Sequence, residues 1–297
     1  MAESRTDRFV RSQGWLEPVG EFIQKVVGAI YGAMGAPGRL LKDIVHGTKV
    51  LGHPLHPALT DVPLGAWVVG VTADLLHYPI PALPTAVGDV GIAFGLIAGL
   101  GSAMSGYTDH HETFEHERRV ATLHGLLMTL VLVLMTVSVV LRWKGGAGGH
   151  GLAVLFALVG VLIAVTGAYF GGHLVFGIGT MVNHNAFAVG PEEFVAVGQA
   201  GEFTEGGLKL VQAGEMPVLV TRVDGKLFAI ANTCSHAGGP LNEGSIEGDV
   251  VTCPWHGSRF CVRDGAVRGG PATFSQPALA VQEEDGQVNV KLAQPLH

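Results

Sequence analysis

The sequence predicts a two-domain membrane protein, in which an all-α four-helix transmembrane bundle is followed by an all-β domain. Apolar residues make up 48% of the chain and charged residues 14%, whereas a soluble domain carries about a quarter charged residues. Four apolar runs before residue 177 are each long enough to cross a bilayer. From about residue 191, short alternating runs are typical of β-strands. The predicted parts are an amphipathic N-terminal helical segment (1–50), a transmembrane domain (51–176), a connector (177–190) and a β domain (191–297).

The N-terminal segment has apolar residues at helical spacing between residues 15 and 49, accompanied by Lys25, Arg39 and Lys42. This pattern is typical of amphipathic helices that lie on a membrane surface. The first 14 residues are polar and lack an apolar stretch that ends in a small-residue cleavage site. We therefore expect no removable signal peptide.

The four apolar runs differ in how clearly they predict membrane spans. The third and fourth are almost free of charge, whereas Asp61 and Asp74 lie in the first and Asp89 near the start of the second. A buried soluble hairpin is therefore an alternative for the first two. Gly91, Gly95 and Gly99 recur every four residues and favour the membrane reading, because small residues let membrane helices approach closely. The predicted spans are Leu59–Ile80, Thr85–Gly106, Val120–Trp143 and Leu152–Phe176.

The distribution of Lys and Arg predicts the orientation. Arg118 and Arg119 follow the second span, on the same side as the N-terminus, and only Arg142 and Lys144 lie in loops on the opposite side. Cytoplasmic loops are enriched in positive residues, so we expect both termini and the β domain in the cytoplasm. An unpaired Cys261, expected as a buried strand residue, fits that reducing compartment. The positive residues before the first span are Arg5, Arg8, Arg11, Lys25, Arg39, Lys42 and Lys49.

The β domain is predicted from several short apolar runs separated by turns. Asp224 and Gly225 lie between two of these runs, and Asp-Gly between apolar strands is a strong hairpin signal. Residues 191–297 contain seven basic and thirteen acidic residues. The domain therefore lacks the basic surface that binds nucleic acid.

Two short boxes in the β domain each offer one thiol and one imidazole. Cys234 and His236 form the first, and Cys253 and His256 form the second. A Cys2His2 zinc site is one interpretation, although zinc sites favour Cys-x-x-Cys and His-x-x-x-His spacings. Mixed boxes match a Rieske [2Fe–2S] cluster, in which one iron takes both Cys and the other takes both His.

Residues 191–297 resemble the Rieske-type ferredoxin domain, on the strength of the sequences CSHAGGPL (234–241) and CPWHGSRF (253–260). The resemblance implies two stacked antiparallel sheets and a cluster-binding subdomain. It also implies that Cys234 and Cys253 bind the inner iron, and that His236 and His256 bind the outer iron near solvent. The residues expected around the cluster are Gly238, Trp255, Ser258, Phe260 and Pro271, the last in a loop that covers the cluster.

Two departures from the Rieske pattern refine this expectation. Quinol-oxidising Rieske proteins carry an extra Cys in each box, and Gly239 and Trp255 stand at those positions here. The chain is thus nearer the ferredoxin and oxygenase branch. Ser258 can donate a hydrogen bond to a sulfide, but Phe260 replaces a Tyr hydroxyl. We expect a potential in the lower half of the Rieske range of about −150 to +300 mV.

The β domain does not contain the other iron centre of a Rieske oxygenase. Such an enzyme also needs a mononuclear iron held by two His and a carboxylate, in a large downstream domain. Only 41 residues follow His256. We expect an electron carrier or a subunit of an oxidoreductase rather than a complete enzyme.

The membrane half is rich in histidine. His53 and His56, in the sequence HPLHP that runs on into Asp61-Val-Pro, resemble the signature of an uncharacterised family of four-helix membrane proteins. With the predicted topology, these two residues, His124 and His173 lie at the cytoplasmic end of the spans. A haem b held by two neutral imidazoles is one interpretation, with His124 and His173 as the expected pair and His56 as a substitute. A non-haem metal site and structural hydrogen bonding are the alternatives.

Three other histidines, His110, His111 and His116, follow the second span in the sequence. They are expected to be solvated or to contact lipid headgroups.

Together these patterns predict a membrane-anchored protein that passes single electrons between a cytoplasmic partner and a membrane redox centre or quinone. The redox partner would be a reductase, an oxygenase or a respiratory complex. One alternative is the ferredoxin component of a membrane oxygenase system. Another is a redox sensor that gates a histidine-lined metal or proton path.

Overall fold

The computed structural model describes residues 4–47, 51–144 and 146–293. Lys49, counted above toward the orientation, lies outside these residues. Contacts divide the chain into two units, residues 1–46 with 54–178 and residues 47–53 with 179–297. The predicted order of a helical domain followed by a β domain is confirmed. The boundaries predicted within the chain remain predictions.

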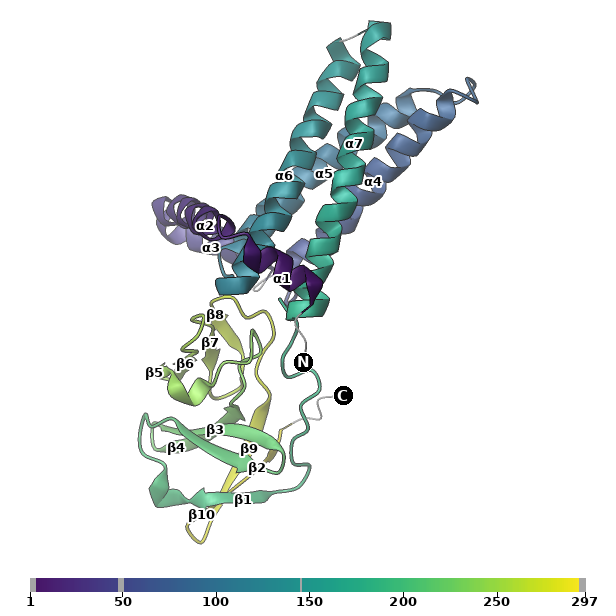
Figure 1. The fold of residues 1–297 in the computed structure, drawn as a ribbon. Helices are drawn as coiled ribbons and strands as arrows, with labels where there is room; N and C mark the ends of the chain where they lie inside the picture. Colours follow the sequence, from purple (N-terminus) through teal and green to yellow (C-terminus); the bar gives the residue numbers. More distant parts are fainter. Residues whose placement is uncertain (1–3, 48–50, 145, 294–297) are drawn as a thin grey trace. The chain divides into compact units, whose positions relative to one another are not determined.

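In the described residues of the first unit, the regular elements are all helices. Successive long helices run antiparallel, so the start of α4, the end of α5, the start of α6 and the end of α7 meet at one end of the bundle (Figure 1). Among the described residues, four helices are long and apolar enough to cross a membrane. The helices are α1 (Arg5–Ser12), α2 (Leu16–Ala33), α3 (Gly35–His46), α4 (Leu55–His77), α5 (Ala86–His110), α6 (Glu115–Lys144) and α7 (Gly146–His173), followed by the π-helix η1 (Leu174–Ile178).

The core of the bundle is packed around Trp67, whose side chain is buried. A Cβ added at Gly95 would lie 2.5 Å from the Trp67 indole, and one added at Gly99 would lie 3.0 Å from it. A Cβ at Gly91 would lie 2.9 Å from the Cα of Gly70 on α4. The predicted glycine stripe thus lies where α5 approaches α4, and outward-facing apolar residues such as Ile97 stay exposed.

Two of the three aspartates that weakened the first two predicted spans, Asp74 and Asp89, share a partner. Arg142 on α6 forms ion pairs with Asp74 and with Asp89, the second at 2.6 Å. The side chains of Arg142 and Asp74 are 2% and 0% exposed, respectively. A buried charge is tolerated when it is paired and hydrogen-bonded, which explains how these helices carry acidic residues.

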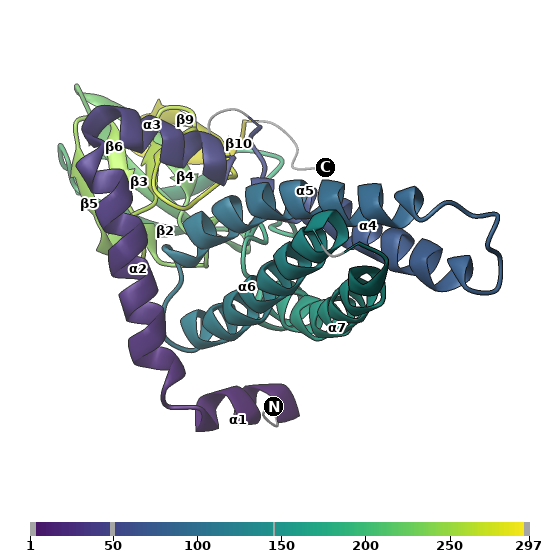
Figure 2. The same cartoon turned by 90° about the horizontal axis from the view of Figure 1, so that it is seen from above.

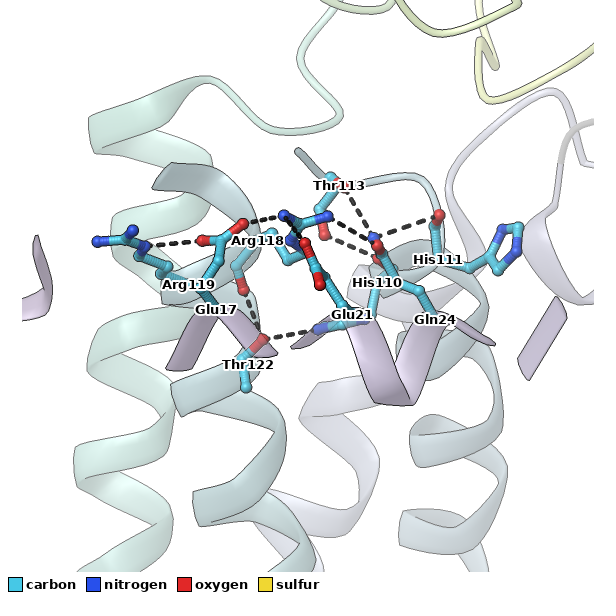
Figure 3. A network of polar contacts seen from close by, with 9 residues as sticks. All are labelled: Glu17, Glu21, Gln24, His110, His111, Thr113, Arg118, Arg119 and Thr122. Atoms are coloured by element: carbon cyan, nitrogen blue, oxygen red, sulfur yellow. Dashed lines mark hydrogen bonds and ion pairs between the residues drawn. The ribbon is translucent and has the colours of Figure 1, made fainter. Parts of the chain in front are cut away.

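The N-terminal helices pack at one end of the bundle, with α2 against α6 and α3 against α5 (Figure 2). Figure 3 shows the polar network that holds α2 there. Arg118 donates to Gln24 at 3.1 Å and pairs with Glu17. The Gln24 amide in turn donates to the carbonyl oxygens of His110 and Thr113, at 2.9 and 2.8 Å. The Gln24 side chain thus ties α2 to the last residue of α5 and to the loop between α5 and α6.

The second unit consists of two antiparallel sheets. The six-stranded sheet has the order β1-β10-β9-β4-β3-β2, and the four-stranded sheet has the order β5-β6-β7-β8. Asp224 and Gly225 join β3 to β4 with φ values of 53° and 74°, the left-handed conformation of the predicted hairpin turn. The strands are β1 (Val195–Gln199), β2 (Lys209–Ala213), β3 (Met216–Val223), β4 (Lys226–Ala231), β5 (Ser245–Glu247), β6 (Val250–Thr252), β7 (Arg259–Cys261), β8 (Val267–Gly269), β9 (Ala278–Glu284) and β10 (Gln287–Leu292).

Candidate functional site: two Cys/His loops

The first Cys/His box lies in the connection between β4 and β5. Its chain closes on itself through two backbone hydrogen bonds. The Cys234 N–H donates to the Gly239 carbonyl, and the Gly238 N–H donates to the Cys234 carbonyl, both at 2.8 Å. Gly238 has a φ of 78°, which favours glycine. The loop is therefore a tight turn that begins at Cys234 and carries His236 within it.

The second box, between β6 and β7, repeats this arrangement. The Cys253 N–H donates to the Ser258 carbonyl at 2.8 Å, and the Gly257 N–H donates to the Cys253 carbonyl at 3.2 Å. Gly257 has a φ of 72°. In each loop, therefore, the cysteine is bonded to the residues four and five positions further on. The two loops therefore close in the same way, although the histidine stands two residues after the cysteine in the first box and three residues after it in the second.

The four side chains converge as two pairs. The thiols of Cys234 and Cys253 are buried and hydrogen-bonded to each other, which lowers the pKa of Cys253 to about 6 and raises the pKa of Cys234. His236 Nδ1 lies 3.0 Å from His256 Nδ1, with the rings nearly perpendicular at 89°. Two ring nitrogens bound to one metal ion lie about 3 Å apart when each bond is about 2.1 Å. The imidazole pair therefore has the spacing of two ligands on one ion.

The pairs fit a two-iron cluster better than a single ion. In the described part of the chain, no group of three or more His, Cys, Asp or Glu side chains has the arrangement that holds a single metal ion. A Rieske cluster needs two protein ligands on each of two irons. The Ser258 hydroxyl supports this fit, because it is buried and has no hydrogen-bond partner among the described residues. A buried hydroxyl normally donates to some acceptor, and a bridging sulfide would be one.

The surrounding residues explain the departures from the quinol-oxidising pattern. A Cβ added at Gly239 would lie 2.9 Å from the Cys253 sulfur and 3.1 Å from the Trp255 ring. Gly239 and Trp255 thus lie against each other where those proteins have two cysteines. Phe260 is fully buried beside both cysteines and offers no hydroxyl.

A third loop approaches the second box from the other side. Pro271 is buried, and a Cβ added at the preceding Gly270 would lie 2.4 Å from the Gly257 carbonyl oxygen. The first box is also tied to this loop, because the Ser235 hydroxyl donates to the Phe274 carbonyl at 2.7 Å. The residues around Pro271 therefore pack against both boxes.

Residues that sequence reasoning missed lie in the predicted connector. The His184 N–H donates to the Ser235 carbonyl at 3.1 Å. The buried Asn185 amide donates to the Thr233 carbonyl and to Gln276, at 2.9 and 2.7 Å. This part of the connector is therefore bonded to the first box instead of being a free tether. Its only sequence signal is the polar run Asn183-His184-Asn185 after the last apolar helix.

The four membrane histidines do not form one cluster. The His53 ring lies 6.3 Å from the Phe274 ring, within the second unit. The His173 Nε2 lies 2.8 Å from the Asp7 carboxylate, which the His116 Nε2 also approaches to 2.8 Å. Hydrogen bonds from Ser4 and from these two histidines lower the pKa of Asp7.

The structure places His124 beside His56, with the ring centroids 6.1 Å apart. The histidines after the second span make specific contacts. His110 Nε2 lies 2.9 Å from the Thr122 hydroxyl, and His111 Nδ1 lies 3.3 Å from Lys42 Nζ.

Two family models match separate parts of the chain. The model of the Rieske [2Fe–2S] domain matches residues 193–282, and the model of a predicted membrane protein (DUF2231) matches residues 52–184. The β unit is thus an electron-transfer domain of the iron–sulfur class, joined to a membrane domain. The chain belongs to the Rieske [2Fe–2S] family, which confirms both predicted resemblances.

Its curated relatives match in the Rieske domain. The ferredoxin component of biphenyl 2,3-dioxygenase from Rhodococcus jostii is 39% identical over 93 residues, which are 31% of this chain and 87% of that protein. The anthranilate 1,2-dioxygenase ferredoxin subunit from Burkholderia cepacia is 35% identical, over 34% of this chain and 93% of that protein. The cytochrome b6-f complex iron-sulfur subunit from Chlorobaculum tepidum is 31% identical, over 33% and 54%.

Among solved structures, the ferredoxin of carbazole 1,9a-dioxygenase from Nocardioides aromaticivorans is 28% identical. The match covers 33% of this chain and 95% of that one, with a TM-score of 0.32.

Proposed function

We propose that this protein is a membrane-anchored electron carrier in which Cys234, His236, Cys253 and His256 bind the Rieske cluster. The observation that carries the proposal is the convergence of the two boxes, with His236 Nδ1 and His256 Nδ1 3.0 Å apart and the two thiols hydrogen-bonded. When bound, a cluster of this type supplies transfer of one electron at a time.

The side chains around the boxes divide the site into an inner and an outer side. Cys234 and Cys253 are 1% and 3% exposed, so they exclude water from the sulfur side. His256 is only half-buried, and the neighbouring Trp255 is 55% exposed. The imidazole side is therefore where a redox partner would approach.

The test is an EPR spectrum of the reduced, detergent-solubilised full-length protein, together with its iron and sulfide content. We expect the rhombic signal of mixed Cys/His ligation. His236→Ala should abolish the signal. The matched control is His184→Ala, because His184 lies near Gly238 but outside both boxes. A protein that holds zinc and no sulfide would contradict the proposal.

A second candidate function is the ferredoxin component of a membrane oxygenase system. The similarity to two dioxygenase ferredoxins favours it. Gly239 and Trp255 also favour it, because they lie close together at the positions where quinol-oxidising Rieske proteins carry two extra cysteines. Reduction kinetics separate the two candidates. Rapid reduction by a pyridine-nucleotide-dependent ferredoxin reductase, without reduction by quinol, favours the oxygenase role. Reduction by quinol favours a respiratory role.

We propose that the membrane domain is embedded in lipid with the Rieske domain and both termini in the cytoplasm. The excess of Lys and Arg before the first span and after the second supports this orientation. Protease treatment of inverted vesicles should release the Rieske domain, whereas right-side-out vesicles should protect it. The reverse result would place the domain outside.

We also propose that the bundle supplies the membrane redox centre, either a haem b or a bound quinone. Four helices with histidines at one end support this part of the proposal. The His173 imidazole is hydrogen-bonded to the Asp7 carboxylate. The pair of histidines that would hold the redox centre within the bundle is therefore His56 and His124.

A further inference from the structure

The four long helices each contribute one group to a small site at the end of the bundle where α4 begins. His56 comes from α4 and His124 from α6, and their ring centroids lie 6.1 Å apart. His56 Nδ1 lies 2.9 Å from the Ser102 carbonyl on α5. His124 Nδ1 lies 2.8 Å from the Gly167 carbonyl on α7. Each imidazole is therefore bonded to a different helix from the one that carries it.

These two bonds determine which nitrogen of each ring is free. A carbonyl oxygen can only accept a hydrogen bond, so Nδ1 carries the proton in both rings and each Nε2 keeps its lone pair. No hydrogen bond joins either Nε2 to a described residue. Metal-binding histidines almost always have this arrangement, with one N–H donated to a carbonyl and the other nitrogen on the metal.

Glycines hold the two rings in place. A Cβ added at Gly106 would lie 2.7 Å from His56 Cε1, and one added at Gly171 would lie 3.1 Å from His124 Cε1. The rings thus fill the space that these glycines leave on α5 and α7. Packing and hydrogen bonding together orient both imidazoles before any ligand binds, which reduces the entropic cost of binding.

The separation of the rings leaves room for one metal ion between them. A metal–imidazole bond is about 2 Å, so the centroids of two rings bound to one ion lie up to about 6 Å apart. The observed separation is 6.1 Å. A purely structural role accounts for the two Nδ1 bonds but leaves two lone pairs without donors among the described residues.

We propose that His56 Nε2 and His124 Nε2 bind one transition-metal centre between them. Neutral imidazole suits iron, copper and zinc and does not suit magnesium or calcium, so the centre is haem iron or a bare ion of one of these metals. The inference deepens the proposed function, because it names the residues and atoms of the membrane redox centre. It does not depend on the Rieske cluster being present.

The test uses the full-length protein in detergent, with haem measured by pyridine haemochrome and copper, zinc and iron by mass spectrometry. We expect one equivalent of haem, or one bare ion beyond the cluster iron, in the wild type. His56→Gln and His124→Gln should each reduce this content at least tenfold. The matched control is His173→Gln, because the His173 imidazole is hydrogen-bonded to Asp7 and is not part of the proposed site. This variant should retain the full haem or metal content.

Two further measurements keep the test decisive. The cluster EPR signal should be unchanged in all three variants, which shows that they fold and separates this inference from the proposed function. If the purified wild type holds neither haem nor metal, hemin, Cu(I) and Zn(II) are titrated in turn. The failure of all three probes to bind stoichiometrically, or equal binding by His56→Gln and His124→Gln, would overturn the proposal.

Discussion

The chain holds two imidazole pairs that are built in opposite ways. In the β unit, His236 and His256 stand in tight loops, and their Nδ1 atoms face each other at 3.0 Å. In the helical unit, His56 and His124 stand on helices, and their Nδ1 atoms bond to carbonyls of other helices. In the proposed sites the loop pair would therefore bind metal through Nδ1, whereas the helix pair would bind it through Nε2.

This difference follows from the backbone around each pair. In the loops, the backbone N–H and carbonyl groups of Cys234 and Cys253 are satisfied by residues of the same loop, and the two imidazoles converge from these loops. In the helices, Ser102 and Gly167 offer carbonyls to side chains from neighbouring helices. A ring between helices thus bonds through one nitrogen and exposes the other. Loop sites depend on turn geometry, and helix sites depend on how the helices pack.

The largest expected effect is the loss of a different metal centre when each of the two histidine pairs is changed. His256→Ala should abolish the cluster EPR signal and leave any metal or haem in the bundle unchanged. His124→Gln should do the reverse. Side-by-side EPR and metal analysis of both variants measures this, and loss of both centres in either variant would show that the two sites are not independent.

The buried charges of the bundle should matter more for stability than the exposed charges of the β unit. Arg142→Met leaves Asp74 buried without its partner and should cost about 3–5 kcal/mol of unfolding free energy. Arg263→Met removes ion pairs with Asp249 and Asp224 at the protein surface, where solvent screens the charges, and should cost much less than Arg142→Met. Thermal unfolding in detergent measures both. Equal losses would contradict the difference in burial.

Asp89→Asn is the matched control within the bundle. Asp89 also pairs with Arg142, but its side chain is 37% exposed. Its replacement should therefore destabilise the protein less than Arg142→Met does.

The potential of the cluster should respond to hydrogen-bond donors near the sulfurs. Phe260→Tyr adds a hydroxyl beside the two cysteines and should raise the midpoint by tens of millivolts, because hydrogen bonds to sulfur tune Rieske potentials. Ser258→Ala should lower it by a similar amount. A redox titration followed by EPR measures both shifts. A fall in potential with Phe260→Tyr would show that the added hydroxyl does not reach a cysteine sulfur.

The smallest expected effect is a pH dependence in the N-terminal helices. Burial lowers the pKa of His46 below its ordinary 6.5. As the pH falls, His46 is therefore protonated in the unfolded chain before it is protonated in the folded chain. The free energy of unfolding decreases between about pH 6.5 and the lower pKa of His46 in the folded chain, by at most about 1.4 kcal/mol per pH unit. Comparison of wild type with His46→Gln between pH 5 and 8 measures this. If the free energy of unfolding depends on pH with the same slope in wild type and in His46→Gln, groups other than His46 cause the pH dependence.

Much of the architecture could be predicted because it depends on local patterns. The four apolar runs predict the membrane helices, although α4 begins at Leu55, four residues before the predicted span. The Asp224-Gly225 turn and the strands beside it could also be predicted, and Cys261 is a buried strand residue as expected. The short strands β5 and β8 have three residues each, too few for a periodic signal.

The ligand chemistry expected of the two boxes can be predicted from sequence alone, because each box is a few consecutive residues whose spacing limits what they can bind. The positions of His124 beside His56 and of His173 in a hydrogen bond with Asp7 are evident only in the folded chain. The same is true of the pairing of Arg142 with Asp74 and Asp89. These partners are distant in the sequence, and they meet only through the rotation and relative height of packed helices, which periodicity within a single helix does not encode.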